Sequence, residues 1–229
     1  MKRHYFLLAL ISVLIFSCSK QEGANNESNE QLDPNQKTVQ SELDTDAAAA
    51  EVDFGRTEWQ NPELVLSSIG NLEGKVIADL GAGSGYFTFK MAETAEKVIA
   101  LDIDPKALEY IENQIAIAGD WANNIETRLT PAEKPNLEVN EADAVLIVNT
   151  YFYIPERQSY LRQLANCIKE NGKLVIVEYK IGDMIVGPSD EFKVTPEAIE
   201  AELRKAGFKS VNVDLQSLQY QFVITAEKR

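Results

Sequence analysis

The residues best suited to chemistry are two acids on either side of a glycine-rich turn. Asp79 lies in one apolar run, Asp102 ends the next, and between them stand Gly81, Gly83 and Gly85. Glycines let the backbone turn sharply and approach a ligand, and a helix that follows offers free N–H groups. Asp102 comes about 20 residues after the turn, where a carboxylate can accept hydrogen bonds from ribose hydroxyls. The pattern predicts a site for a nucleotide-type cofactor.

The spacing of the glycines separates two cofactor classes. A dinucleotide site needs the pattern G-x-G-x-x-G, but the third position counted from Gly81 is Tyr86, and Gly85 comes one residue early. Asp79 stands two residues before the first glycine, which is unfavourable beside a pyrophosphate and suits a ligand with an ammonium and a sulfonium group. This favours S-adenosylmethionine over NAD. The alternative is a tight strand-to-helix turn that binds nothing.

Proline and glycine divide the chain after residue 56 into alternating elements. Helices are predicted to start at four prolines and to end near four glycines, which are Pro62, Pro105, Pro155 and Pro196, then Gly70, Gly119, Gly172 and Gly207. Buried strands are predicted over 76–80, 98–101, 125–129, 144–148 and 174–178, followed by an antiparallel pair over 211–215 and 220–225. The order predicts an α/β, Rossmann-like, doubly wound sheet of seven strands, mostly parallel with an antiparallel C-terminal strand.

With these motifs in view, the run from Trp59 to Asp104 resembles the core of class I S-adenosylmethionine-dependent methyltransferases, and the likeness extends to the C-terminus. It covers about three quarters of the chain. Within that superfamily, a group of small bacterial methyltransferases is similar in segments 59–62, 85–88 and 174–180. Members of that group often carry a tyrosine and paired histidines after the fourth strand, whereas this chain reads Asn-Thr-Tyr-Phe-Tyr at 149–153.

Ligands of such sheets bind beyond the carboxyl ends of the strands, near the point where the strand order reverses. The resemblance implies that Asp79 and the glycine turn hold the methionine part of the cofactor, that Asp102 holds the ribose, and that the Thr130 region lies at the adenine edge. An ordinary turn before Pro131 is the alternative for Thr130. Phe54 and Trp59 are implied to form a cap. The expected cofactor contacts are Asp79, Gly81, Gly83, Gly85, Tyr86, Asp102, Thr130 and Asn149.

Methyl transfer from a sulfonium is an in-line displacement, so the protein contributes mainly alignment and a water-poor site. Candidates for helping an acceptor to lose a proton follow the fourth and fifth strands, namely Tyr151, Tyr153, Glu178 and Tyr179. Aromatic packing is the alternative for these residues. No metal is expected, because the domain lacks histidine and has one cysteine, Cys167, whose helical setting indicates packing.

The N-terminus predicts export. Lys2 and Arg3 precede an apolar run of about a dozen residues, which is too short for a bilayer-spanning helix, and Cys18 follows a small residue as in bacterial lipoproteins. We expect a lipoprotein-type signal over 1–18 with Cys18 lipidated, an acidic disordered tether over 19–55 and a methyltransferase domain over 56–229. The mature protein would then be anchored to a membrane on the periplasmic face or cell surface. An ordinary signal peptide is the alternative.

The formal net charge of -14 argues against nucleic acid as a partner. The sequence therefore predicts S-adenosylmethionine-dependent methyl transfer to a small-molecule or lipid-associated acceptor. An exported cofactor-binding or interaction module without turnover is the alternative, because a signal would carry the domain away from cytosolic S-adenosylmethionine.

Overall fold

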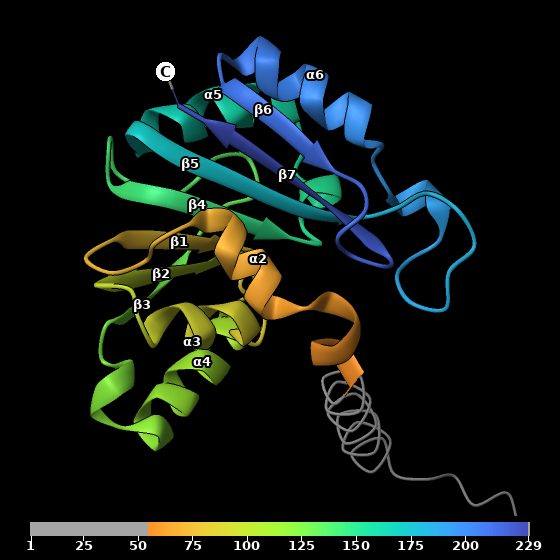
Figure 1. Cartoon of the computed structure of the whole chain (residues 1–229). Helices are drawn as coiled ribbons and strands as arrows, with labels where there is room; N and C mark the ends of the chain where they lie inside the picture. Colours follow the sequence, from red (N-terminus) through yellow and green to blue (C-terminus); the bar gives the residue numbers. More distant parts are fainter. Residues whose placement is uncertain (1–54, 229) are drawn as a thin grey trace, which may run out of the picture. The chain divides into compact units, whose positions relative to one another are not determined.

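The computed structural model describes residues 55–228. The expected signal, the tether up to residue 54, Cys18 and Phe54 lie outside these residues. Within them, no helix is long and apolar enough to cross a membrane. The seven strands form one sheet in the order β3-β2-β1-β4-β5-β7-β6, as Figure 1 shows. Their bounds are β1 Val76–Leu80, β2 Lys97–Asp102, β3 Ile125–Leu129, β4 Ala142–Val148, β5 Ile168–Tyr179, β6 Lys209–Asp214 and β7 Gln221–Glu227.

The sheet is parallel from β3 to β5, and β7 runs antiparallel to both β5 and β6. The predicted fold class and its reversed C-terminal strand are thus confirmed. β1 and β4 are neighbours although β2 and β3 separate them in the chain, so the strand order reverses between them. A ligand crevice is expected at their carboxyl ends.

Helices cover both faces of the sheet (Figure 1). Side chains from α2 (Pro62–Ile69), α3 (Tyr86–Ala92) and α4 (Pro105–Ala118) pack on one face. Side chains from α5 (Arg157–Cys167) and α6 (Pro196–Ala206) pack on the other. Successive side chains of β4 point to opposite faces of the sheet. Leu146 packs in the core under α2, α3 and α4, Ile147 packs in the core under α5 and α6, and both are fully buried. A strand buried on both faces explains the continuous apolar runs of the sequence.

Helix caps follow the predicted pattern at three of the four prolines. The side chains of Asn61, Asp104 and Thr195 accept hydrogen bonds from the backbone N–H groups of Leu64, Lys106 and Ala198, and proline stands in the first turn each time. Such caps satisfy N–H groups that have no partner inside the helix.

Two predicted helix boundaries are wrong. The helix expected at Pro155 begins at Arg157, because residues 151–153 form a separate 3₁₀ turn and Glu156 takes a left-handed conformation with φ 45°. Gly172 does not end that helix, which stops at Cys167. Gly172 lies in β5, where the pairing with β4 is interrupted between Ile168 and Lys173. Because the chain passes directly from helix to strand, no glycine is needed to end the helix.

Candidate functional site

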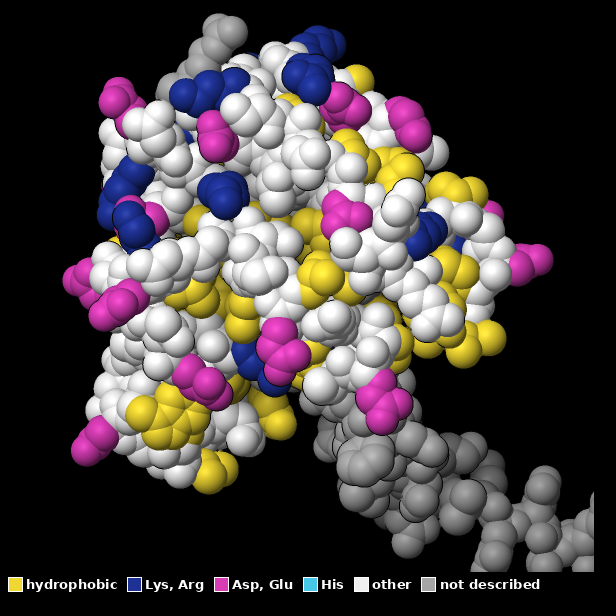
Figure 2. Space-filling view, in the orientation of Figure 1, with side chains coloured by type: hydrophobic (Ala, Val, Ile, Leu, Met, Phe, Trp, Pro, Cys, Tyr) yellow, Lys and Arg dark blue, Asp and Glu magenta, His cyan; other side chains and the backbone are white. Residues whose placement is uncertain are grey.

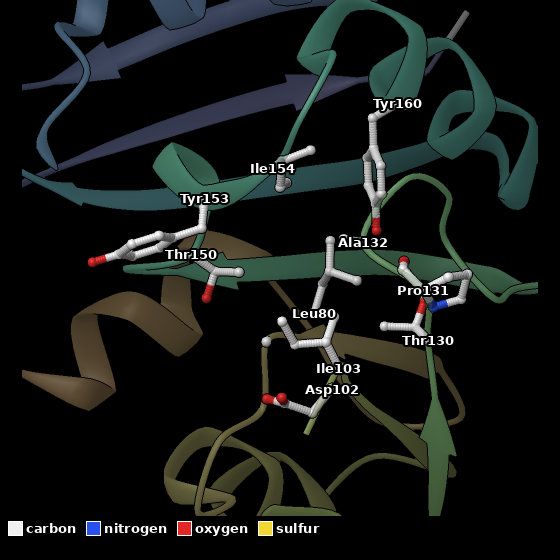
Figure 3. A pocket seen from close by; sticks show the side chains of 11 residues that line it. Leu80, Asp102, Ile103, Thr130, Pro131, Ala132, Thr150, Tyr153, Ile154 and Tyr160 are labelled. Carbon is white, nitrogen blue, oxygen red and sulfur yellow. The ribbon is translucent and has the colours of Figure 1, made fainter. Parts of the chain in front are cut away.

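A cavity of about 220 Å³ opens at the carboxyl ends of β1, β2 and β4, where the strand order reverses. Figure 3 shows that Asp102 and Thr130 come from one side of it and Tyr153 and Tyr160 from the other. Most of its wall is apolar. The lining residues are Leu80, Gly81, Asp102, Ile103, Thr130, Pro131, Ala132, Thr150, Tyr153, Ile154 and Tyr160.

The glycine turn carries the chain from β1 into α3 through three left-handed positions. Gly81, Gly83 and Gly85 have φ angles of 79°, 54° and 84°. A Cβ on Gly81 would lie 2.2 Å from Oγ1 of Thr150, so this glycine lets the turns after β1 and β4 touch. A Cβ on Gly83 would meet no atom within 4 Å. The backbone at Gly83 therefore faces open space, as a ligand cradle requires.

Asp102 joins the turn to the end of β2. Its Oδ2 accepts a hydrogen bond of 2.8 Å from the Gly83 N–H, and its Oδ1 accepts one of 2.9 Å from the Asp104 N–H. Each carboxylate oxygen can accept more than one hydrogen bond, so these two bonds fix the group and leave capacity for a ligand hydroxyl. Asp102 also lines the cavity, in agreement with its predicted place beside a ribose.

Asp79 is buried under the turn, where its Oδ2 accepts a 2.6 Å hydrogen bond from the Thr88 hydroxyl. Burial raises the pKa of Asp79 to about 6, although the Thr88 bond and the charge of Arg56 act in the opposite direction. A neighbouring cation would favour the ionised form of this carboxylate, against the burial that disfavours it. This suits the predicted contact with an ammonium group.

Thr130 lines the cavity, but its hydroxyl serves its own loop. Oγ1 accepts a hydrogen bond from the Asn136 N–H and donates one to the Lys134 carbonyl, both at 3.1 Å. The side chain therefore fixes the turn that places Pro131 and Ala132 against the cavity. The hydroxyl of Thr130 stabilises its own turn, as the alternative interpretation expected. The position of the loop at the cavity still agrees with a place at the adenine edge.

The structure separates Tyr151 and Glu178 from the cavity. The Tyr151 hydroxyl donates to Glu202 of α6, and burial followed by that bond raises the pKa of Tyr151 well above its usual range. Oε1 of Glu178 accepts a 2.7 Å hydrogen bond from the Tyr151 N–H. Burial raises the pKa of Glu178 to about 7, against the hydrogen bonds that it accepts from backbone amides. Both residues thus hold the 3₁₀ turn η2 (Tyr151–Tyr153) in place.

Tyr153, in contrast, lies on the rim of the cavity and is 62% exposed. Its ring packs edge to face on Phe152, at 5.3 Å between ring centroids, and Phe152 packs on Phe192 at 5.7 Å. Ile103 on the opposite rim is 63% exposed. The mouth of the cavity is therefore lined by apolar side chains that solvent can reach.

Asn149 and Tyr179 meet beside the glycine turn but outside the cavity lining. The Asn149 side chain donates a 3.3 Å hydrogen bond to the Tyr179 hydroxyl. The Tyr179 ring lies 6.0 Å from that of Trp59, which also packs on Tyr220 at 6.4 Å. Burial raises the pKa of Tyr179, so its hydroxyl stays protonated at neutral pH. Trp59 thus contacts the end of β5, which fits its expected role as a cap.

Sequence reasoning missed three residues of this region, Arg56, Gln60 and Gln221, whereas Thr150 lies in the expected segment 149–153. Thr150 contacts Gly81, and Arg56, Gln60 and Gln221 form a polar chain that ends on Asn149. The spacing of Arg56 and Gln60 is that of one helical turn, which the sequence could have indicated. Gln221 is 161 residues from Gln60, and no local signal pairs them.

In residues 55–228, no group of three or more His, Cys, Asp or Glu side chains could hold a metal ion. Cys167 is buried in the packing of α5, as its helical spacing predicts.

Comparisons with known proteins show what this chain is similar to. Residues 78–176 match the model of a methyltransferase domain. This match covers less than half of the chain. Its structure is similar to an S-adenosylmethionine-dependent methyltransferase from Aquifex aeolicus, with a TM-score of 0.71 and 24% identity over 76% of this chain and 93% of that one. This likeness confirms the fold, and the family match agrees with the predicted class, a class I methyltransferase that uses S-adenosylmethionine.

Curated relatives differ in the acceptor that their names give. A tRNA U34 carboxymethyltransferase of Aeromonas hydrophila is 27% identical over 69% of this chain and 52% of the relative. A demethylmenaquinone methyltransferase of Tropheryma whipplei is 30% identical over 52% of this chain and 48% of the relative. The chain spans about half the length of the curated relatives it matches. The predicted exclusion of nucleic acid is not confirmed, because several of the relatives are named for tRNA.

Substitution of Gly83 by alanine tests whether the open space above the turn is a ligand site. The left-handed backbone makes us expect a loss of about 1 kcal/mol of stability and a large loss of affinity for S-adenosylhomocysteine. Gly74→Ala is the matched control, since Gly74 also has a positive φ, 68°, and no atom within 4 Å of a Cβ. Thermal melts and calorimetry should show equal destabilisation and lost binding only in Gly83→Ala. Equal affinities in the two variants would contradict the assignment.

Asp79 gives a pH dependence with a defined sign. The free protein holds a proton on Asp79 up to a pKa of about 6, whereas a bound ammonium group favours the ionised carboxylate. Affinity for S-adenosylhomocysteine should therefore rise with pH below 6, by up to about tenfold per pH unit, and level off above 7. Calorimetry from pH 5 to 8 measures this profile. A flat profile in the natural protein, or an unchanged slope in Asp79→Asn, would refute the contact.

Proposed function

We propose that this protein transfers the methyl group of S-adenosylmethionine to a small apolar or membrane-associated acceptor. One cavity brings together the glycine turn and Asp102 with a mouth that is apolar and accessible to solvent, and this observation carries the proposal. One half of this arrangement suits a nucleoside cofactor, and the other half suits an apolar acceptor.

The residues fit S-adenosylmethionine on structural grounds. Gly83 leaves space for a ligand against the backbone, Asp79 suits an ammonium group, and Asp102 stands where a ribose can be bound. Thr130 and its loop would lie against the adenine. When bound, the cofactor supplies a methyl group that its sulfonium has already activated.

The chain's own contribution is alignment and the exclusion of water. The phenols of Tyr151, Tyr160 and Tyr179 have raised pKa values, chiefly because of burial, so they are poor bases at neutral pH. Glu178 is bonded to the backbone of η2. The only histidine in the sequence, His4, lies in the expected signal. These facts favour an acceptor atom that needs little help in losing a proton, with Tyr153 on the rim as a contact.

The mouth of the cavity supports an apolar acceptor. Beside Tyr153 and Ile103, exposed apolar side chains stand on the segment between β5 and α6, where Ile181 is 48%, Ile185 86% and Phe192 44% exposed. Figure 2 shows hydrophobic side chains gathered over this segment. A contiguous apolar patch of this kind is typical of sites for apolar ligands or membranes.

Charge argues against tRNA. Binding to a phosphate backbone needs clusters of Lys and Arg, and the sequence has 22 of these residues against 36 acids. On the face shown in Figure 2, the basic side chains stand in small groups among acidic ones. A quinone-like acceptor, such as the name of one relative gives, fits this surface better.

The N-terminal sequence extends the proposal to location. Lipidation of Cys18 would hold the domain near a membrane without a transmembrane helix, and the acidic residues 19–55 would act as the tether. Labelled palmitate should enter the full-length protein and be lost in Cys18→Ser. Equal labelling of both proteins would reject the anchor.

An exported module that binds the cofactor without turnover is the second candidate function. It is favoured by the predicted signal, because a domain carried out of the cytosol leaves the pool of S-adenosylmethionine.

Labelled methyl transfer separates these functions. We expect the full-length protein to move label from S-adenosylmethionine into an organic-extractable or small-molecule fraction of cell extract and not into tRNA. Asp102→Asn, which keeps the shape of the side chain, should lower the rate by about 10- to 100-fold through weaker cofactor binding. Label in tRNA alone would overturn the proposed acceptor. Cofactor binding with no label in any fraction would support the non-catalytic module.

A further inference from the structure

The segment 181–193, between β5 and α6, forms a loop that stands out beyond the carboxyl end of β5 (Figure 1). Its tip carries three apolar residues in succession, Met184, Ile185 and Val186. Ile185 is 86% exposed, more than any other large apolar side chain in residues 55–228, and its two neighbours are half-buried. A run of apolar residues at a loop tip costs solubility and indicates a function there.

A buried lysine closes the neck of this loop. The Lys193 side chain is 2% exposed, and its Nζ donates to the Gly182 carbonyl at 3.1 Å and to Oδ1 of Asp190 at 2.7 Å. The Asp190 carboxylate accepts hydrogen bonds of 3.0 and 3.1 Å from the Gly182 N–H. The hydrogen bond from Lys193 lowers the pKa of Asp190, so the pair stays ionised at neutral pH. The tip is thus held in place before any partner binds.

The loop is also packed against the site. A Cβ on Gly187, whose φ is 95°, would lie 2.6 Å from Cδ1 of Tyr179, so the backbone of this glycine packs directly on the Tyr179 ring. At the other end of the loop, the Phe192 ring lies 5.7 Å from that of Phe152, which contacts Tyr153 on the rim of the cavity. Aromatic contacts therefore connect the loop to the mouth of the cavity.

The size and the charge of the tip favour a lipid surface as its partner. A stable protein interface buries about 800 Å² per partner, from roughly 20 residues or more, and three side chains do not supply that area. A bilayer can take up a narrow apolar tip, with an affinity that scales with the apolar area buried. Residues 181–192 contain three acids and neither Lys nor Arg, so attraction to anionic headgroups cannot drive the contact.

We propose that Met184, Ile185 and Val186 insert into the apolar layer of a lipid bilayer and place the mouth of the cavity against the membrane. The inference rests on the proposed function, because its consequence is that an acceptor dissolved in lipid reaches the cavity beside Tyr153. A lipid on Cys18 would only keep the domain near the membrane, whereas the loop orients the cavity toward it. The competing role for the tip is a contact with a second copy of this chain.

A fluorophore at the tip tests the insertion. Full-length Cys18→Ser protein carries a polarity-sensitive fluorophore on Ile185→Cys or, as the matched control, on Ile117→Cys, since Ile117 is 77% exposed on α4. Cys167 is buried and should not react. With phosphatidylcholine vesicles, emission from position 185 should shift to the blue and be quenched by nitroxides on the acyl chains, with no change at position 117. The fluorophore reports its own surroundings, so vesicle binding by the apolar N-terminal run does not produce this signal.

Hydrogen exchange gives a second readout without a label. Vesicles should slow exchange of the amides of residues 183–187 by about tenfold in the full-length natural protein and in Ile117→Ser, and by less than about twofold in Ile185→Ser.

The other outcomes have separate meanings. No shift at position 185, or an equal shift at position 117, would overturn the inference. A dimer that is lost in Ile185→Ser, measured by analytical ultracentrifugation, would assign the tip to a second copy and also overturn it. Calorimetry with S-adenosylhomocysteine keeps the proposals apart. Insertion without binding of this ligand to the natural protein rejects the proposed function and leaves the membrane contact standing, whereas binding without insertion rejects only the role of the loop.

Discussion

The close approach of two backbone turns is the constraint on which the rest of the site depends. The turn after β1 touches the turn after β4 at Gly81 and Thr150, where no side chain larger than hydrogen fits on the glycine. This contact is possible because β1 and β4 are neighbours in the sheet with their carboxyl ends side by side. The same approach leaves the backbone of Gly83 open and brings its N–H to Asp102. A shift of either turn would disturb the cofactor half of the cavity and its apolar mouth together.

Buried polar groups then fix the parts that the strands do not hold directly. Glu178 accepts from the backbone of η2, Tyr151 bonds across to Glu202 on α6, and Asp79 bonds to Thr88 on α3. Each ties an element at the rim of the cavity to the core. Buried polar groups are costly unless hydrogen-bonded, so such pairs favour a single arrangement. Tyr151 and Glu178 are thereby held in positioning roles, and Tyr153 is the candidate that remains at the cavity.

Local signals in the sequence predicted the strands, three caps and the places of the glycine turn and Asp102 at the carboxyl ends of β1 and β2. Asp104 caps α4 through Lys106, two residues away, and the positive φ of Gly81 belongs to a turn that its neighbours define. The sequence could not show that Tyr151 turns toward α6, because Glu202 lies 51 residues further on. The hydrogen bond between Gln60 and Gln221 also joins residues far apart in the chain. It depends on the pairing of β7 with β5, and so does the position of Arg56, which bonds to Gln60.

We expect the glycine turn to bind the amino-acid nucleoside S-adenosylmethionine or its product and not to bind a dinucleotide. Titration calorimetry of the full-length protein with S-adenosylhomocysteine and with NAD tests it most directly. We expect one molecule of S-adenosylhomocysteine to bind per chain and NAD to give no heat of binding. Binding of NAD in its place, or no binding of S-adenosylhomocysteine, would contradict the account.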